Sequence, residues 1–438
     1  MGKYSRYPSY KEVDLDYVKT IPDGWKDASL SKLFRIQAGG DVQSKFFSTV
    51  KTASHSYPIY TNANDAKAVY GYTSQSNYSR NSITVSGRGE VGFAVYRDHD
   101  FDAIIRLLVL SPRVALDCRF FAYFINEVID FNVQSSAIGQ LSTLQISPYK
   151  VLIPSREEQT QIANFLDHET AKIDTLIEKQ QQLIKLLKEK RQAVISYAVT
   201  KGLNPQAPTK DSGVEWLGEV PEHWVVAGFK KYLASIVDYR GKTPNKVESG
   251  RFLVTARNIK KGRINYLSSA EYVSEADYAQ VMSRGVPNIG DVLFTTEAPL
   301  GEVAQVDNSD IALAQRVIKF CGQSGVLDNT YLKYFIMSDS FQDSLMTYAS
   351  GSTALGIKAE RLVYLRQLLP PLSEQTQIVT HIEAVTTKID LLEQKAIAAI
   401  DLMQERRTAL ISAAVTGKID VRNWQAPISQ NQAMEQTA

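Results

Sequence analysis

A long segment near the middle of the chain returns near its end with almost the same sequence. Residues 153–200 align without a gap on residues 369–416, and 22 of the 48 aligned pairs are identical. The motif Glu-Gln-Thr-Gln-Ile, for example, begins at Glu158 and again at Glu374. Two helices that merely share an amphipathic pattern do not share this many identities. The chain is therefore a duplicated unit.

The repeat continues upstream of this segment. Ile-Pro-Asp-Gly-Trp ends at Trp25 and corresponds to Val-Pro-Glu-His-Trp, which ends at Trp224. Tyr-Phe-Ile occurs at Tyr123 and again at Tyr334. The offset between matching residues grows along the chain from 199 to 211 to 216, as small insertions in the second copy would produce. Each copy reads as a globular domain followed by a long helix.

The repeated segment predicts long amphipathic helices. Pro154 is followed by Ser155 and, three residues later, Glu158, which is the pattern of a capping box at a helix start. The residues of one helix face then recur alternately four and three positions apart, as in the seam of a coiled coil: Ile173, Ile177, Gln180, Ile184, Leu187, Arg191 and Val194. Leu176, Leu183 and Leu186 widen this apolar stripe. We expect the two helices to pair as an antiparallel coiled coil with pseudo-twofold symmetry, holding two domains apart. The alternative is two independent helices, each lying on its own domain.

The domains themselves combine strands and helices. Residues 82–85 and 91–96 read as short strands around a glycine turn, whereas residues 120–131 read as a helix. The expected fold class is α+β, with two globular domains and an internal repeat. The expected boundaries are a first domain at 1–154, a central connector helix at 155–203, a second domain at 204–371, a C-terminal connector helix at 372–422 and a flexible tail at 423–438.

Composition excludes several classes of protein. The formal net charge is only +2 and 44% of the residues are hydrophobic, so the chain is not a wholly basic nucleic-acid coat. No stretch has the apolar length of a membrane span, so we expect a cytoplasmic protein without membrane contact. The cysteines, Cys118 and Cys321, suggest neither disulfide nor zinc site. Between Lys230 and Glu271 there are ten Lys or Arg against three acidic residues, interleaved with Tyr and Asn, which favours DNA contact over a merely solvated face.

The sequence contains no convincing active site. Residues 87–92 fit G-x-G-x-x-G, but an alternating strand pattern follows where a phosphate-binding loop requires a helix, so we read this segment as a turn that presents Arg88. Gly241-Lys242-Thr243 lacks the earlier glycine of a P-loop and is followed by Pro244. The histidines lack metal-ligand spacing.

Two motifs resemble a known family. Residues 212–224, Ser-Gly-Val-Glu-Trp-Leu-Gly-Glu-Val-Pro-Glu-His-Trp, are similar to a motif at the start of the recognition domains in specificity subunits of type I restriction-modification enzymes. The Pro-x-x-x-Glu-Gln-x-x-Ile sequences that begin at Pro154 and Pro370 resemble the connector regions of the same family. The resemblance covers the whole chain. The first copy departs from it at residues 14–18, Asp-Leu-Asp-Tyr-Val, which affects packing near the N-terminus.

The resemblance implies a DNA-reading scaffold without catalysis of its own. Each target recognition domain would read one half-site of a bipartite target in double-stranded DNA, and the paired helices would fix the unread spacer. Two methyltransferase subunits would bring S-adenosylmethionine for adenine methylation, and two restriction subunits would bring ATP and Mg²⁺. The chain would bind no cofactor itself and would work in the prokaryotic cytoplasm at the nucleoid. The alternatives are a coiled-coil scaffold without specific DNA binding and a self-contained DNA enzyme.

Candidate DNA contacts follow from base chemistry, because Arg and Lys suit the acceptors of guanine and Asn and Gln suit adenine. In the first domain the candidates are Arg80, Arg88 and Gln140. In the second they are Arg240, Lys242, Arg257, Asn258, Lys260 and Arg263.

Overall fold

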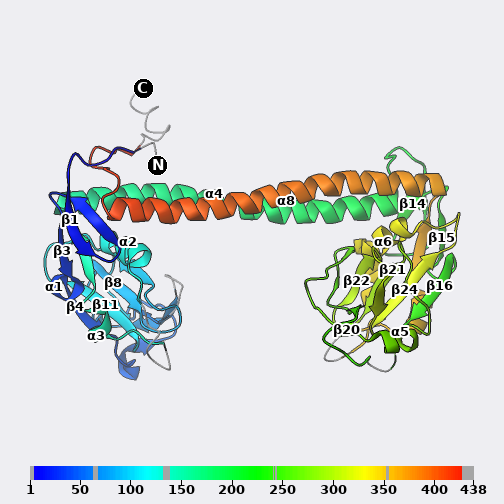
Figure 1. The fold of residues 1–438 in the computed structure, drawn as a ribbon, viewed down its shortest axis with the longest axis horizontal. Coiled ribbons are helices and arrows are strands. Elements are labelled where there is room, and N and C mark those ends of the chain that lie inside the picture. The colour runs from blue at the N-terminus through cyan, green and yellow to red at the C-terminus, as the bar shows by residue number, and fades with distance from the viewer. Residues whose placement is uncertain are drawn as a thin grey trace. The chain divides into compact units, whose positions relative to one another are not determined.

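The chain forms two compact units, which we describe separately (Figure 1). The computed structural model describes residues 4–62, 68–131, 139–239, 241, 244–351 and 355–426. Unit 1 contains Met1–Gln180 and Ala398–Ala438, and unit 2 contains Gln181–Ile397. Each unit therefore combines a globular head with one part of each long helix, α4 (Arg156–Lys201) and α8 (Leu372–Val415).

The head of unit 1 is built on a four-stranded antiparallel sheet in the order β4-β11-β8-β9. A smaller sheet, β10-β6-β7-β5, contains the parallel pair β10 and β6. The elements are β1 (Tyr10–Leu15), β2 (Val18–Pro22), β3 (Lys26–Ser29), α1 (Leu30–Leu33), β4 (Phe34–Ala38), η1 (Ser44–Phe46), β5 (Phe47–Ser48), β6 (Tyr57–Tyr60), β7 (Val69–Thr73), β8 (Ser82–Ser86), β9 (Ala94–Arg97), β10 (Asp102–Ala103), β11 (Leu107–Pro112), α2 (Cys118–Val128), α3 (Thr143–Ile146) and β12 (Lys150–Ile153).

The head of unit 2 repeats this plan. Its main sheet has the order β16-β24-β21-β22, and its smaller sheet, β20-β17-β23, again contains one parallel pair, β17 and β23. The elements are β13 (Thr209–Asp211), β14 (Glu219–Pro221), β15 (Val225–Gly228), β16 (Leu233–Asp238), β17 (Arg251–Val254), β18 (Ile259–Lys260), β19 (Arg263–Ile264), β20 (Tyr272–Val273), α5 (Glu275–Val281), β21 (Val292–Thr296), β22 (Leu300–Gln305), β23 (Ile311–Leu313), β24 (Val317–Gly322), α6 (Asn329–Met337), α7 (Asp339–Tyr348), η2 (Ala359–Tyr364) and β25 (Arg366–Leu369). The predicted α+β class and internal repeat are confirmed.

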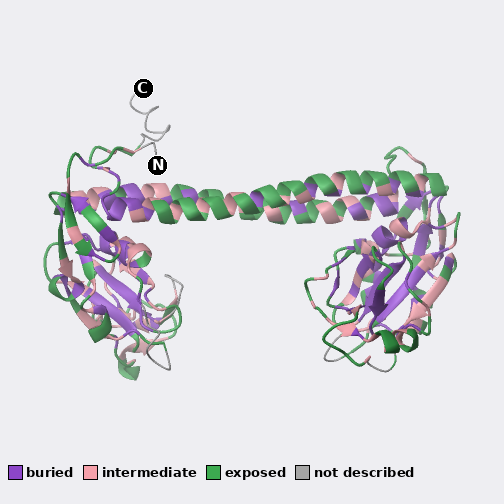
Figure 2. Cartoon of the chain, in the orientation of Figure 1, coloured by how far each residue is buried: buried purple, intermediate pink, exposed green. Residues whose placement is uncertain are grey.

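Buried residues are concentrated in the strands of each main sheet and in the helices of the same unit (Figure 2). The core of unit 1 includes Trp25 at 1% exposure, and the core of unit 2 includes Trp224 at 0%. The tryptophans that mark both copies in the sequence are therefore packing residues. Trp424, which we had assigned to a flexible tail, packs its ring 5.4 Å from that of Phe165, so the packed chain extends further than expected.

The long helices run antiparallel within each unit, as predicted. In unit 2, Lys188 pairs with Glu393 at 3.5 Å and Arg191 pairs with Asp390. A later residue of α4 thus pairs with an earlier residue of α8, so the two helices run in opposite directions. In unit 1, Nε of Arg407 donates to Oδ1 of Asp174 at 2.9 Å. Asp174 and Asp390 are 216 positions apart, as are Arg191 and Arg407, so the same ion pair occurs once in each unit with the roles of the helices exchanged.

The helix seam is narrower than the sequence suggested. Ile173 and Leu187 are each 7% exposed, as expected for seam residues. Leu176, Leu183 and Leu186, which we expected to widen the seam, are 49%, 40% and 53% exposed. The reason is geometric, since a pair of helices buries only a narrow stripe on each partner and these leucines lie beside it.

Both long helices are followed by a glycine in the left-handed conformation. Gly202 has φ 75° and Gly417 has φ 72°. A Cβ on Gly417 would lie 2.5 Å from Cδ of Pro22 and 3.4 Å from the Trp25 ring. Glycine therefore both permits the helix to end and leaves room for the tryptophan motif.

We expect Gly417→Ala to lower the stability of unit 1 by more than the roughly 1–2 kcal/mol that left-handed backbone costs a residue with a Cβ. Gly89→Ala is the matched control, because Gly89 has φ 77° in the same unit but nothing within 4 Å of its Cβ position. Hydrogen exchange of the backbone amides in β4 and β11, within the full chain, measures both losses in the correct unit. Equal losses in the two variants would show that the contact with Pro22 contributes nothing.

None of the helices in the described ranges has the length and apolar character needed to cross a membrane.

Candidate nucleic-acid interface

The turn after β8 brings Arg88 and Gln140 together. They form an isolated antiparallel bridge, and both side chains are exposed. Asn62, just after β6, fixes the turn: its Oδ1 accepts from the backbone N–H of Gly87 at 2.7 Å and of Arg88 at 3.1 Å, and its Nδ2 donates to the Arg88 carbonyl. No helix follows residues 87–92; the chain continues into β9, so this G-x-G-x-x-G segment is a turn, as we inferred.

Arg80 lies elsewhere in the same head and lines a surface cavity of about 630 Å³. Tyr57, Tyr60 and Tyr72 contribute to the lining of this cavity, as does His99. The Tyr60 hydroxyl and Nε2 of His99 share a hydrogen bond of 2.8 Å. Aromatic side chains beside Arg80 suit base stacking and phosphate contact, and Asp98 and Asp100 line the same cavity.

In unit 2, three predicted residues are exposed on or beside the β18–β19 hairpin. Lys260 and Arg263 are cross-strand partners in this hairpin. Arg257 just precedes it, with its side chain 71% exposed and 3.9 Å from Glu271. The side chain of Arg263 is 79% exposed and lies 3.7 Å from Asp390 of α8. Arg240 and Lys242, also predicted contacts, lie outside the described residues.

Asn258 does not belong to this exposed group. Its side chain is 0% exposed. Oδ1 accepts from the backbone N–H of Thr255 at 2.9 Å and from its hydroxyl at 2.8 Å, while Nδ2 donates to the carbonyls of Asn265 at 3.0 Å and Ser269 at 2.9 Å. A buried amide whose oxygen and nitrogen both hydrogen-bond within the protein cannot bond to the edge of adenine. The prediction that Asn258 contacts DNA is therefore wrong. Its role is to hold the loop that carries Arg257.

A cavity of about 880 Å³ lies beneath the hairpin in unit 2, between it and the helix pair. Lys260, Lys261 and Arg263 line one side, and Arg191 and Asp390 line the other. Asp390 pairs with Arg191 across the helices and with Arg263 of the hairpin, so one carboxylate joins the exposed loop to the connector.

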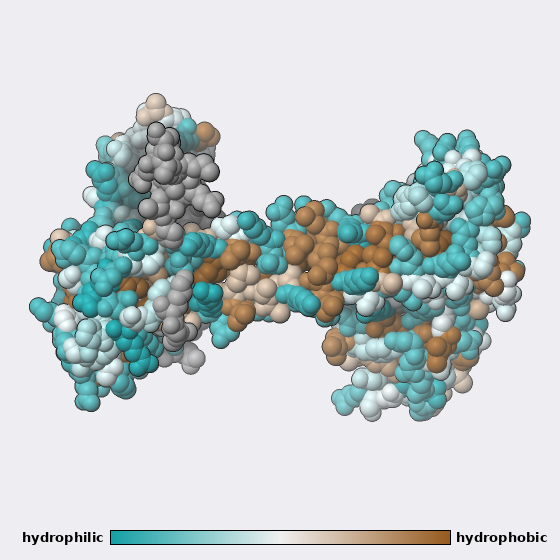
Figure 3. Space-filling view, turned by 90° about the horizontal axis from the view of Figure 1, so that it is seen from above, coloured by the Kyte–Doolittle hydropathy of each residue, from teal (hydrophilic) through white to brown (hydrophobic). Residues whose placement is uncertain are grey.

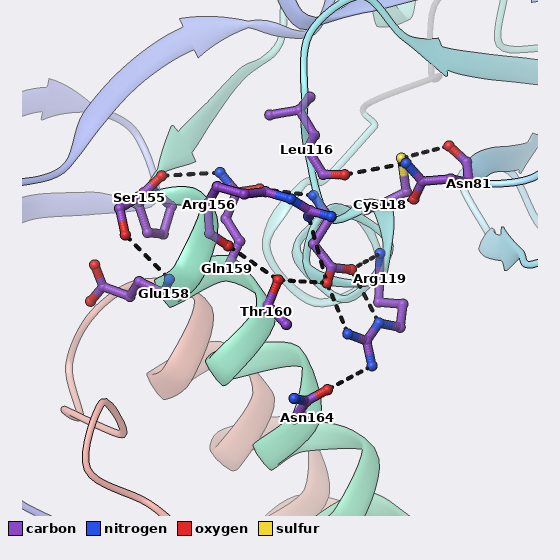
Figure 4. Close-up of polar contacts among 12 residues, drawn as sticks. Asn81, Leu116, Cys118, Arg119, Ser155, Arg156, Glu158, Gln159, Thr160 and Asn164 are labelled. Atoms are coloured by element: carbon purple, nitrogen blue, oxygen red, sulfur yellow. Dashed lines mark hydrogen bonds and ion pairs between the residues drawn. The ribbon is translucent and has the colours of Figure 1, made fainter.

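The repeated Glu-Gln motif positions each head on its helix. In unit 1, Oε1 of Gln159 accepts from the Asp117 N–H at 3.0 Å and its Nε2 donates to the Pro154 carbonyl at 3.0 Å (Figure 4). Asp117 is the N-cap of α2. Burial raises the pKa of Asp117, but hydrogen bonds and charge from Arg119 outweigh this and leave the pKa below its ordinary value.

Unit 2 repeats this arrangement with Gln375, whose Oε1 accepts from the N–H of Asp328, the N-cap of α6, at 2.8 Å and whose Nε2 donates to the Pro370 carbonyl at 2.9 Å. Both glutamines are fully buried or nearly so. The strongest sequence repeat therefore belongs to the framework that carries the exposed loops, and the loops themselves differ.

Two observations on the described residues concern metal binding and thiol chemistry. The described residues contain no group of three or more His, Cys, Asp or Glu side chains arranged to hold a metal ion. Burial raises the pKa of Cys118 to about 12, so this thiol stays protonated and unreactive at neutral pH. The exposed candidates described above are basic and amide side chains, which suit phosphates and base edges.

Sequence reasoning missed Asn62, Tyr60 and His99. His99 stands in Asp98-His99-Asp100, and from the sequence we consider the histidines only as metal ligands. In the structure Nδ1 of His99 lies 2.6 Å from Oδ1 of Asp98, and the ring faces Tyr60. The run of tyrosines at 57, 60, 70 and 72 was the signal in the sequence that pointed to this surface.

Comparison with known proteins agrees with this picture. The chain is 25% identical over 285 residues to the type I restriction enzyme MjaVIII specificity subunit of Methanocaldococcus jannaschii, a match that covers 63% of each protein. The chain thus spans less than two thirds of that relative's length. It is 20% identical over 434 residues to the type I restriction enzyme EcoDI specificity subunit of Escherichia coli, covering 93% of this chain and 91% of the relative.

A solved chain from a study of the assembly and conformational transition of the type I R-M system has the same fold, with a TM-score of 0.67, 13% identity and coverage of 91% of this chain and 99% of that one. Residues 22–186 and 245–401 match the family model described as type I restriction modification DNA specificity domain. With most of its length in these two matches, the chain belongs to the type I restriction modification DNA specificity domain family.

Proposed function

We propose that this chain is the DNA-recognition subunit of a type I restriction-modification complex. The observation that carries the proposal is the duplicated specificity domain, with exposed Arg, Lys and Gln side chains on differing loops of two similar heads. Each head reads one short half-site in double-stranded DNA, and the paired helices set the unread spacer between the half-sites. Two different loop sets on one framework suit a split target with two different halves.

The chemistry belongs to partner subunits. Two methyltransferase subunits supply S-adenosylmethionine for adenine methylation, and two restriction subunits supply ATP and Mg²⁺ for cleavage; this chain directs them without catalysing either reaction. It acts in the cytoplasm at the nucleoid. Exposed apolar side chains on the helix pair support a docked partner (Figure 3). In unit 2 these are Leu183, Leu186, Leu391, Leu392 and Ile397, each 40–53% exposed.

Genome-wide mapping of methylated adenine tests the proposal, with the gene intact, deleted and restored on a plasmid. We expect deletion to abolish one split motif, consisting of two short defined ends around a fixed gap, and restoration to return it. The motif would name both half-sites and the spacer.

An unchanged methylome in a cell that expresses the methyltransferase subunit would overturn the proposal. Two alternatives then separate on purified protein. A coiled-coil scaffold binds duplex DNA only through weak, salt-sensitive charge attraction. A self-contained DNA enzyme methylates or cuts DNA without partners.

A further inference from the structure

The Arg88–Gln140 bridge places two side chains with complementary base chemistry next to each other. Residues directly opposite in an antiparallel bridge point to the same side, with Cβ atoms about 4.5–5.5 Å apart. Arg forms paired hydrogen bonds with O6 and N7 of guanine, and Gln with N6 and N7 of adenine. Successive base pairs are stacked about 3.4 Å apart. Two neighbouring side chains at this spacing therefore fit two adjacent base pairs better than they fit a single base pair.

The backbone beneath the two side chains is held from three directions. Asn62 bonds the backbone of Gly87 and Arg88, as described above. The Gly87 N–H also donates to the Arg106 carbonyl at 3.0 Å, and the Gly87 carbonyl accepts from Leu141 N–H at 2.7 Å. A Cβ on Gly87 would lie 2.5 Å from the Arg106 carbonyl oxygen, so the packing allows only glycine there. The turn is preorganised, which reduces the entropy lost when it meets a base edge.

The side chains themselves are available. Arg88 and Gln140 are exposed, and no ion pair to Arg88 occurs among the residues that the structure describes. Arg257 and Arg263 of unit 2, by contrast, each have an acidic neighbour. A guanidinium that has no carboxylate partner in the described part of the chain, on a fixed turn and beside an amide, has the features of direct base readout.

We propose that Arg88 and Gln140 read two adjacent base pairs, a G·C pair and an A·T pair, within the half-site of the first head, and that Asn62 is the positioning residue of this reading turn. The inference rests on the proposed function. It predicts that one half-site of the split motif contains a guanine and an adenine at neighbouring positions, on the same strand or on opposite strands.

The test maps the methylated motif in cells whose only copy of the gene carries Arg88→Ala, Gln140→Ala or Lys32→Ala. We expect Arg88→Ala to relax one G·C position and Gln140→Ala to relax the adjacent A·T position, each with a roughly 5- to 150-fold loss of discrimination against the wrong base. The other half-site and the gap remain unchanged. Lys32→Ala is the matched control, because it removes an exposed positive charge from the same head without touching the turn; it leaves the motif intact.

Asn62 is tested in the same assay. Asn62→Ala removes all three bonds to the turn and should relax the same G·C position as Arg88→Ala. Asn62→Asp keeps an oxygen for the two N–H donors and should restore most of the discrimination. A merely structural role would lower the melting temperature and leave every position of the motif as selective as in the wild type.

Two outcomes overturn the inference: relaxed positions that are not adjacent, and an unaltered motif in both Arg88→Ala and Gln140→Ala. Both side chains are exposed, so these two variants should fold even if Asn62→Ala does not. A wild-type gene that directs no split motif would instead reject the proposed function, so the two failures are distinguishable.

Discussion

Replacing Asp291 with Ala should lower the free energy of unfolding of unit 2 by about 3–5 kcal/mol, the usual cost of leaving one buried charge without its partner. Nζ of Lys319 lies 2.6 Å from Oδ2 of Asp291, and their side chains are only 6% and 3% exposed. Asp291 also accepts from the Asn288 N–H at 2.9 Å. Removal of this carboxylate leaves the Lys319 ammonium buried in the main sheet beside Leu293, its cross-strand neighbour.

Because the chain has two units, a single unfolding curve need not be two-state. Hydrogen exchange of the backbone amides in β21 and β24 measures the effect in the correct unit.

The double variant Asp291→Ala with Lys319→Met should recover most of the loss, since no buried charge remains. Glu360→Ala is a surface control, because its pair with Lys358 is exposed and spans 3.9 Å; its effect should stay below about 1 kcal/mol. Unchanged protection in Asp291→Ala would refute the stabilising role of the pair.

The largest functional change should come from lengthening the paired helices. Seven residues are inserted before Lys188 in α4 and seven more after Glu393 in α8, at positions that face each other in unit 2. One heptad preserves the seam and adds about 10 Å of helix. Under the proposed function, methylation of the original motif should disappear, and a new motif should appear with the same two half-sites and a gap longer by about 3 base pairs.

Methylome mapping of cells with the lengthened gene provides the measurement. The matched control inserts seven residues at Gly213, a position with open space around it in the turn between β13 and β14. That insertion leaves the helices unchanged and should leave the gap unchanged. A changed half-site with the original gap would show that the helices do not set the spacer.

The sequence alone predicted the parts of this fold that depend on local pattern. The internal repeat, the α+β class and the antiparallel helices follow from identities and heptad spacing around residues such as Ile173 and Leu187. The exposure of Leu183 and Leu186 could not be predicted, because a leucine beside a seam looks the same in sequence as one within it. The split of each helix between two units likewise depends on tertiary packing.

The candidate site was predictable only by residue type. Base chemistry identified Arg88 and Gln140 separately, but 52 positions separate them, and only the fold shows that they form a bridge. Asn258 had the right chemistry and the wrong environment, since burial of a polar side chain is decided by neighbours distant in sequence. Conversely, Gln159 and Gln375 stood out in the repeat because both make the same pair of hydrogen bonds between a head and its long helix.

Unit 1 is formed by two separate stretches of the chain, which affects the order in which the two units can fold during synthesis. Unit 2 is one continuous stretch, Gln181–Ile397, whereas unit 1 also requires Ala398–Ala438. Ile411, Ala414, Val415 and Ile419 from that last stretch are at most 4% exposed within the core of unit 1. A ribosome adds about 5–20 residues per second, so the first head waits about 10–40 s for its missing helix while unit 2 emerges. The head that is synthesised first is completed last, and over that interval the apolar residues that pack against the end of α8 lack these partners.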